Sequence, residues 1–215
     1  MILSTGRSYV FIHIPKTGGT SLALALESRA MKDDIMLGDT PKARRRRHRV
    51  KGIKTKGRLW KHSTLADIDG LVPGPVLDGL FAFTLVRNPW DRMVSYYHWL
   101  QQQDFDHSSV RLAKSLEFAD FATHRQTRAT FRGSPAASYM RRADGTEQCS
   151  AYIRIEDFAS DAAPLVAHLG FEPVLTVENQ SDRNRDYRSY YTASAADAVA
   201  ESCDQDITRF GYRFG

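Results

Sequence analysis

A lysine, two glycines and several small hydroxyl residues stand together near the start of this 215-residue chain. They follow the apolar run 10–14 and read Pro15-Lys16-Thr17-Gly18-Gly19-Thr20-Ser21. The pattern predicts a buried strand, a glycine turn and a helix over about 20–30. Such a turn gathers backbone N–H groups, a helix N-terminus and an ammonium group around one point, which suits a bound phosphate.

The order of these residues argues against the usual ATP- or GTP-binding loop. That loop reads G-x-x-x-x-G-K-[ST], with its lysine after the glycines. Here Lys16 precedes Gly18 and Gly19. The pattern therefore favours a different phosphate-binding turn, and an ordinary strand–turn–helix corner stays open as the alternative.

An arginine and a serine provide a second candidate for phosphate binding. The apolar run 80–86 predicts a buried strand, and Arg87 follows it where ligands of open α/β sheets bind. Asn88 and Pro89 are suited to begin a helix, which we expect to reach about residue 103, with Ser95 two turns along it. A guanidinium fork and a hydroxyl are good phosphate donors, although a capped helix start alone would also explain the pattern.

Together the two segments resemble the sulfotransferases that use 3′-phosphoadenosine-5′-phosphosulfate (PAPS). The Lys16–Ser21 segment is similar to the family's 5′-phosphosulfate-binding loop, and residues 86–97 are similar to its 3′-phosphate-binding segment. The similarity is closest to the branch of carbohydrate O-sulfotransferases and their small bacterial relatives. It continues through 179–181, 187–192 and 206–212, and is poor over 31–58 and 101–149, where such enzymes build acceptor sites.

The resemblance implies a role for each matching residue. Lys16 would contact the 5′-phosphosulfate bridge, while the 3′-phosphate would be bound by Arg87 and Ser95. The loop residues expected to supply backbone and hydroxyl donors are Thr17, Gly18, Gly19, Thr20 and Ser21. Sulfuryl transfer would be an in-line attack through a loose transition state, giving adenosine 3′,5′-bisphosphate as the second product. No metal is implied, and no His, Cys or carboxylate cluster suggests one.

An acceptor hydroxyl needs a base, and His62 is the first candidate because it lies where this branch of the family places its catalytic histidine. The alternative is a surface histidine in a basic loop. His13 is weaker, since strand alternation beside Phe11 would bury it, and His98 and His107 stay open. We expect Asp91, Arg92 and Glu156 to be structural.

Positive charge is concentrated in one insert, at about 41–62. Residues 42–61 hold five lysines and six arginines with no acidic residue, and the whole chain has a formal net charge of +5, which leaves −6 for the rest. This basic segment is either a solvated loop or a contact for an anionic acceptor. Trp60 is its one aromatic residue, so specific nucleic-acid binding is weakly supported.

The remaining patterns predict an α/β protein with a P-loop-like three-layer fold, in which helices flank a central, mainly parallel sheet. We expect a strand over 151–155, helices over 116–124, 162–169 and 193–210, and a loop with a short helix over 127–148. The loop 180–185 would cover the nucleotide and add arginine contacts. The three late tyrosines are expected to pack rather than stack on adenine: Tyr187, Tyr190 and Tyr191.

Length and composition favour one domain over 1–215, without a membrane span, a signal segment or a disulfide scaffold, and hence a cytoplasmic protein. The leading hypothesis is a PAPS-dependent sulfotransferase acting on a hydroxyl of a carbohydrate or another polar metabolite, either neutral or anionic. A nucleotide kinase or NTPase with an atypical phosphate loop is one alternative. A non-catalytic polyanion-binding protein is the other.

Overall fold

The computed structural model describes residues 1–175 and 183–215. It divides into two compact units, which we describe separately. The first comprises Met1–Val86 and Ala136–Glu178, and the second comprises Arg87–Pro135 and Asn179–Gly215.

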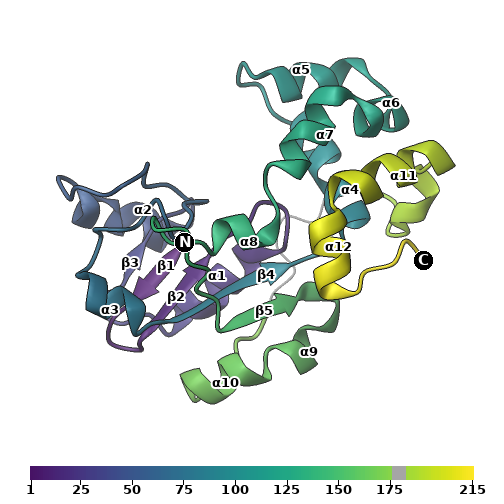
Figure 1. The fold of residues 1–215 in the computed structure, drawn as a ribbon. Coiled ribbons are helices and arrows are strands. Elements are labelled where there is room, and N and C mark those ends of the chain that lie inside the picture. The colour runs from purple at the N-terminus through teal and green to yellow at the C-terminus, as the bar shows by residue number, and fades with distance from the viewer. Residues whose placement is uncertain (176–182) are drawn as a thin grey trace. The chain divides into compact units, whose positions relative to one another are not determined.

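The first unit is built on a five-stranded sheet with the order β3-β1-β2-β4-β5. Its strands are β1 (Ile2–Ser4), β2 (Tyr9–Ile12), β3 (Ile35–Met36), β4 (Phe81–Val86) and β5 (Ala151–Arg154). Strands β2, β4 and β5 pair in parallel, while β1 is antiparallel to both β2 and β3. Four of the five strands therefore run in one direction, which confirms the mainly parallel sheet (Figure 1).

Both faces of this sheet are buried. Alternate residues of β2 point to opposite faces, so that Phe11 joins one hydrophobic cluster with α1 (Gly19–Ser28) and α10 (Ala163–Leu169). Val10 joins the other cluster, which α3 (Gly74–Asp78) and apolar residues of the 59–72 segment cover. Layers on both sides of a parallel sheet are the three-layer arrangement that the sequence predicts.

The first unit has further short helices, of which the sequence predicted only the one within 127–148. They are α2 (Pro41–Arg46), η1 (Arg47–Val50), α8 (Ala136–Tyr139), η2 (Ile155–Asp157) and α9 (Phe158–Asp161). The predicted helix at 162–169 is confirmed as α10, and Gly170 ends it with a φ of 72°, the left-handed conformation that glycine adopts readily.

The second unit is helical and has its own aromatic core. Its elements are α4 (Pro89–Gln101), α5 (Ser108–Ser115), α6 (Phe118–Thr123), α7 (Arg125–Arg132), η3 (Tyr187–Tyr190), α11 (Ala193–Ser202) and α12 (Asp204–Phe210). The Asn88 side chain accepts hydrogen bonds from the N–H groups of Trp90 and Asp91, which confirms the predicted cap of α4. Tyr187, Tyr190 and Tyr191 pack against the core, as expected.

Two predictions for this unit were wrong in detail. A single helix over 193–210 is instead two helices, because Cys203 leaves the helical conformation between α11 and α12. The segment 127–148, predicted as a loop with one short helix, instead contains most of α7, with Thr127 and Phe131 buried, as well as α8. The longest described helix, α4, has 13 residues, and no helix of the described chain is long and apolar enough to cross a membrane.

We expect Phe83→Ala to lower the free energy of unfolding by about 3–5 kcal/mol, because it leaves a cavity at the centre of the sheet. Phe83 is fully buried in β4 and its ring centroid lies 5.4 Å from that of Phe11. Denaturant unfolding measures the loss. Val76→Ala is the control in the same unit, since Val76 is 39% exposed, and a loss as large as that of Phe83→Ala would contradict this account.

Candidate functional site

The turn between β2 and α1 has an unusual backbone. Lys16 has a φ of 66°, in the left-handed region that side chains other than glycine rarely adopt, and Gly18 has a φ of 84°. The Thr17 hydroxyl donates to the Ile14 carbonyl at 2.9 Å and is buried, which holds the turn in place. Of the predicted donors, the Thr17 hydroxyl is therefore engaged within the loop itself. Such a strained conformation is typical of ligand-binding turns.

The two glycines are required by close packing. A Cβ atom added at Gly18 would lie 2.0 Å from Ile155 Cδ1, and one added at Gly19 would lie 2.2 Å from His13 Cδ2. No real side chain can be accommodated at such distances without moving its neighbours. Gly18 has no side chain that could cap α1, and the Ser21 N–H bonds back to the Gly18 carbonyl at 3.1 Å. The N–H groups that begin a helix suit an anion.

The structure brings His62 next to this turn, with His13 between them. His13 is 4% exposed and lies against Gly19. The ring of His62 contacts the His13 ring edge-on, with centroids 4.7 Å apart, and its Nδ1 lies 2.7 Å from the His13 carbonyl oxygen. The burial of His13 is confirmed. The first-choice base and the predicted phosphate turn therefore belong to one packed cluster.

The His13 carbonyl fixes the tautomer of His62. A carbonyl oxygen only accepts hydrogen bonds, so Nδ1 of His62 must carry the proton and donate it. Burial lowers the pKa of His62 to about 4, and burial also holds the pKa of His13 well below its usual value. At neutral pH both rings are uncharged, and Nε2 of His62 has the lone pair that a general base needs.

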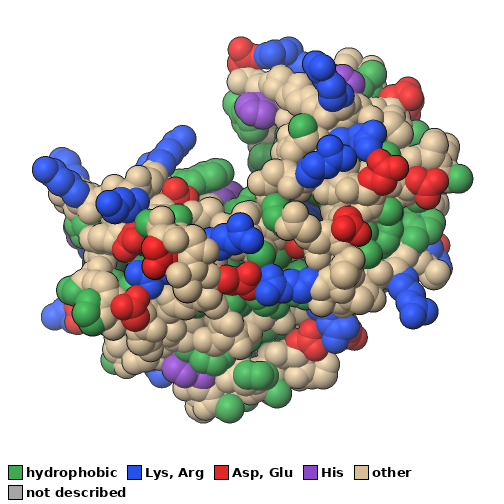
Figure 2. Space-filling model, viewed as in Figure 1, with side chains coloured by type: hydrophobic (Ala, Val, Ile, Leu, Met, Phe, Trp, Pro, Cys, Tyr) green, Lys and Arg blue, Asp and Glu red, His purple; other side chains and the backbone are tan. Residues whose placement is uncertain are grey.

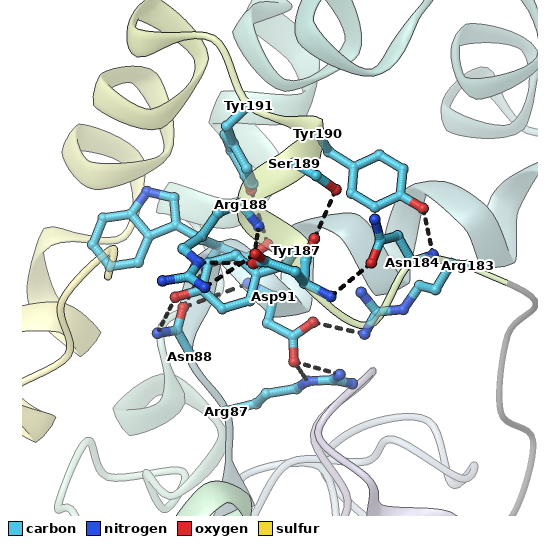
Figure 3. A network of polar contacts seen from close by, with 12 residues as sticks. Arg87, Asn88, Asp91, Arg183, Asn184, Tyr187, Arg188, Ser189, Tyr190 and Tyr191 are labelled. Carbon is cyan, nitrogen blue, oxygen red and sulfur yellow. Dashed lines mark hydrogen bonds and ion pairs between the residues drawn. The ribbon is translucent and has the colours of Figure 1, made fainter.

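In the second unit, Arg87 lies in a network of charged side chains (Figure 3). Its Nε and Nη2 donate to Asp91 Oδ2 at 2.8 and 2.6 Å, and Arg183 Nη2 donates to Asp91 Oδ1 at 2.6 Å. One carboxylate thus holds two guanidinium groups, which confirms Asp91 as an ion-pairing residue. Ser95 lies four residues after Asp91 on α4, and hence on the same face of that helix, where it is buried.

Arg183 is one of the two arginines of the loop 180–185, and its side chain is described in the structure. The sequence predicted arginine contacts from the loop 180–185, of which 180–182 lie outside the described residues. The Arg183 side chain is only 11% exposed, and its buried Nη1 has no hydrogen-bond partner within the described chain. A buried, unpaired guanidinium N–H beside a second arginine indicates an anion site. The signal in the sequence was only a basic loop late in the chain.

The other two candidate histidines belong to the second unit. His107 Nδ1 accepts from the Ser109 N–H at 3.2 Å and caps α5. His98 packs against Tyr97 and Tyr190, and burial, followed by the charge of Arg183, lowers its pKa. Across the described residues, no three His, Cys, Asp or Glu side chains are grouped to hold a metal ion.

Comparison with known families bears on the reaction class. A model of the sulfotransferase family matches residues 1–212. This chain belongs to the sulfotransferase family. No curated protein and no solved structure gave a significant match. This family is the one that both motifs resemble, and its membership supports sulfuryl transfer rather than a nucleotide kinase reaction.

We expect Gly19→Ala to destabilise this sulfotransferase by about 1–3 kcal/mol, since the buried His13 ring must move to admit a methyl group. Gly74→Ala is the matched control, because a Cβ at that exposed position in α3 meets no atom within 4 Å. Thermal and urea unfolding compare the two variants. Equal stability of both would show that the turn is not tightly packed on His13.

The stability of the sulfotransferase should fall as the pH drops from about 6.5 to about 4. In that range the His62 of the unfolded chain binds a proton and that of the folded chain does not, because its folded pKa is about 4. Each such group contributes up to about 1.4 kcal/mol per pH unit. In urea titrations at several pH values, His62→Gln should flatten the profile. His48→Gln removes an exposed histidine and serves as control. A profile of His62→Gln as steep as the wild type's would contradict the pKa shift of His62.

Proposed function

We propose that this sulfotransferase transfers a sulfuryl group from PAPS to a hydroxyl group of a carbohydrate or similar polar acceptor, with His62 as the base. The observation that carries the proposal is the cluster of the phosphate-type turn, His13 and His62 in one unit. It joins a cationic turn for the donor to a neutral imidazole of defined tautomer. The family membership supplies the reaction class.

The donor's 5′ end would be bound at the turn. Lys16, the first N–H groups of α1 and the hydroxyls of Thr20 and Ser21 form the proposed donor set there. During transfer the S–O bond to the 5′-phosphate breaks and a bond forms between sulfur and the acceptor oxygen. The leaving phosphate gains negative charge, which Lys16 is suited to stabilise.

His62 would take the proton of the acceptor hydroxyl at Nε2. In the protein alone its pKa is about 4, lower than a base working at neutral pH requires. Negative charge close to an imidazole favours the protonated form and raises its pKa. Binding of the anionic donor beside the cluster would therefore bring His62 nearer to its working range.

The 3′-phosphate would be bound by Arg87 and Ser95, with Arg183 as a third donor. Arg87 and Arg183 are held together by Asp91, and the unpaired Nη1 of Arg183 fits an oxyanion. A guanidinium pair suits a phosphate dianion, which can accept several hydrogen bonds at once. The family match runs through the residues of both compact units, which supports treating 1–215 as one sulfotransferase domain.

Calorimetric titration with adenosine 3′,5′-bisphosphate tests the donor site, beside ADP and ATP. We expect selective binding of the bisphosphate, weakened about 10- to 100-fold in Arg87→Ala, because a charge-assisted hydrogen bond contributes about 1.5–3 kcal/mol. Arg125→Ala, which removes an exposed arginine of α7, should bind like the wild type. Equal affinity for ATP would favour the kinase alternative.

His62→Gln should separate binding from chemistry. The variant should bind adenosine 3′,5′-bisphosphate as the wild type does, yet lower the transfer rate about 100- to 10,000-fold with saturating PAPS and an acceptor found by screening. An unchanged rate would exclude His62 as the base and would direct attention to another proton acceptor.

A further inference from the structure

The eleven cationic side chains of residues 42–61 divide into two groups in the structure. Four are partly buried and bonded: Lys42 to the Glu27 carbonyl, Arg46 and Arg49 to carbonyls of the 31–34 turn, and Lys61 to Asp39. The other seven are exposed, and their side chains make no hydrogen bond or ion pair within the described chain: Arg44, Arg45, Arg47, Lys51, Lys54, Lys56 and Arg58. In Figure 2, Lys and Arg side chains project from the surface over α2 and the segment after it.

Trp60 has an exposed side chain in this basic segment, and its backbone is hydrogen-bonded to a buried residue. It is 45% exposed, which is unusual for the largest apolar side chain. The backbone N–H of Trp60 donates to Ser63 Oγ at 2.8 Å, and Ser63 is fully buried, with its hydroxyl donating to the Arg58 carbonyl oxygen at 2.9 Å. The guanidinium of Arg58 lies 5.8 Å from the Trp60 ring centroid. A buried serine thus holds the backbone of Trp60, and the exposed indole lies beside a cation.

The indole of Trp60 also touches the proposed base. Its ring packs edge-on against His62, with centroids 5.1 Å apart and an interplanar angle of 83°. A molecule resting on the exposed part of Trp60 would therefore lie next to His62. Because His62 is the group that would take the acceptor's proton, this position is where the acceptor must lie.

We propose that Trp60 and Arg58 form the acceptor subsite of this enzyme and that the acceptor is an acidic saccharide, one whose sugar ring carries carboxylate or sulfate groups. The inference rests on the proposed function of His62. The apolar C–H face of a sugar ring would pack on the indole, and Arg58 would pair with an acidic substituent. The other six exposed cations would attract the anionic chain from a distance.

Charge and the single aromatic ring together favour a saccharide over the other polyanions. Single-stranded nucleic acid is bound by successive aromatic rings that stack successive bases, and residues 42–61 contain only Trp60. A neutral sugar would use the indole and gain nothing from seven exposed cations. A sugar with acidic groups uses both features and also carries the hydroxyl that receives the sulfuryl group.

Binding measurements on the full chain test this inference, with adenosine 3′,5′-bisphosphate present. The probes are a sulfated glycosaminoglycan hexasaccharide, its desulfated and carboxyl-reduced counterpart, and a deoxythymidine oligonucleotide of similar charge. The variants are Trp60→Ala, Trp60→Phe and Arg58→Gln. Arg132→Gln removes an exposed arginine of α7 and is the matched control for charge.

We expect Trp60→Ala to weaken hexasaccharide binding at least about 10-fold and Trp60→Phe to restore most of it, because an aromatic face is what the site requires. Arg58→Gln should weaken binding and reduce its salt dependence, whereas Arg132→Gln should change neither. The neutral hexasaccharide and the oligonucleotide should bind more weakly. Affinity for adenosine 3′,5′-bisphosphate should be the same in all four variants.

Two results would overturn the acceptor subsite while leaving sulfuryl transfer intact. One is hexasaccharide binding that is absent or unaffected by Trp60→Ala, and the other is oligonucleotide binding as tight as that of the hexasaccharide. Failure of the wild type to bind adenosine 3′,5′-bisphosphate is a different outcome, because it removes the proposed donor site itself. The two failures are thus distinguishable in one set of titrations.

Discussion

The hydrogen bond from His62 to the backbone carbonyl of His13 is the interaction on which the candidate active site depends. It joins residues 49 positions apart in the chain and sets the proton of His62 on Nδ1. His13 is itself fixed, because it is buried just after β2 and its imidazole ring packs against the backbone of Gly19. The position of the proposed base is therefore coupled through His13 to the packing of the turn between β2 and α1.

In the second unit, a shared carboxylate holds two cationic side chains together. Two arginines would repel each other, and Asp91 compensates by accepting from both. Its carboxylate orients Arg87 and Arg183, and the buried Nη1 of Arg183 has no hydrogen-bond partner among the described residues. The charge of the group is +1 before any ligand binds, which suits a dianionic phosphate better than a neutral molecule.

Local sequence patterns were sufficient to predict the strands and the helix cap near the candidate sites. The apolar runs before Lys16 and Arg87 predicted β2 and β4, and Asn88 predicted the start of α4. Strands β1 and β3 have three and two residues, too few for a periodic pattern. β1 pairs with β2 across the short turn 5–8, and β3 depends on its pairing with β1. The break at Cys203 was missed because its neighbours are all compatible with a helix. The pairing of Arg183 with Asp91 and the contact between His62 and His13 could not be predicted, since both join residues far apart in the chain.

The approach of the His13 ring to the backbone of Gly19 also has a consequence for how this enzyme can change over generations. The two positions share one small volume, so a larger residue at 19 fits better with a smaller one at 13. A smaller residue at 13 would keep the carbonyl that His62 uses, since every amino acid supplies one. Substitutions at the two sites are therefore expected to arise more often as pairs, because a smaller side chain at 13 lessens the destabilisation that a methyl group at 19 causes.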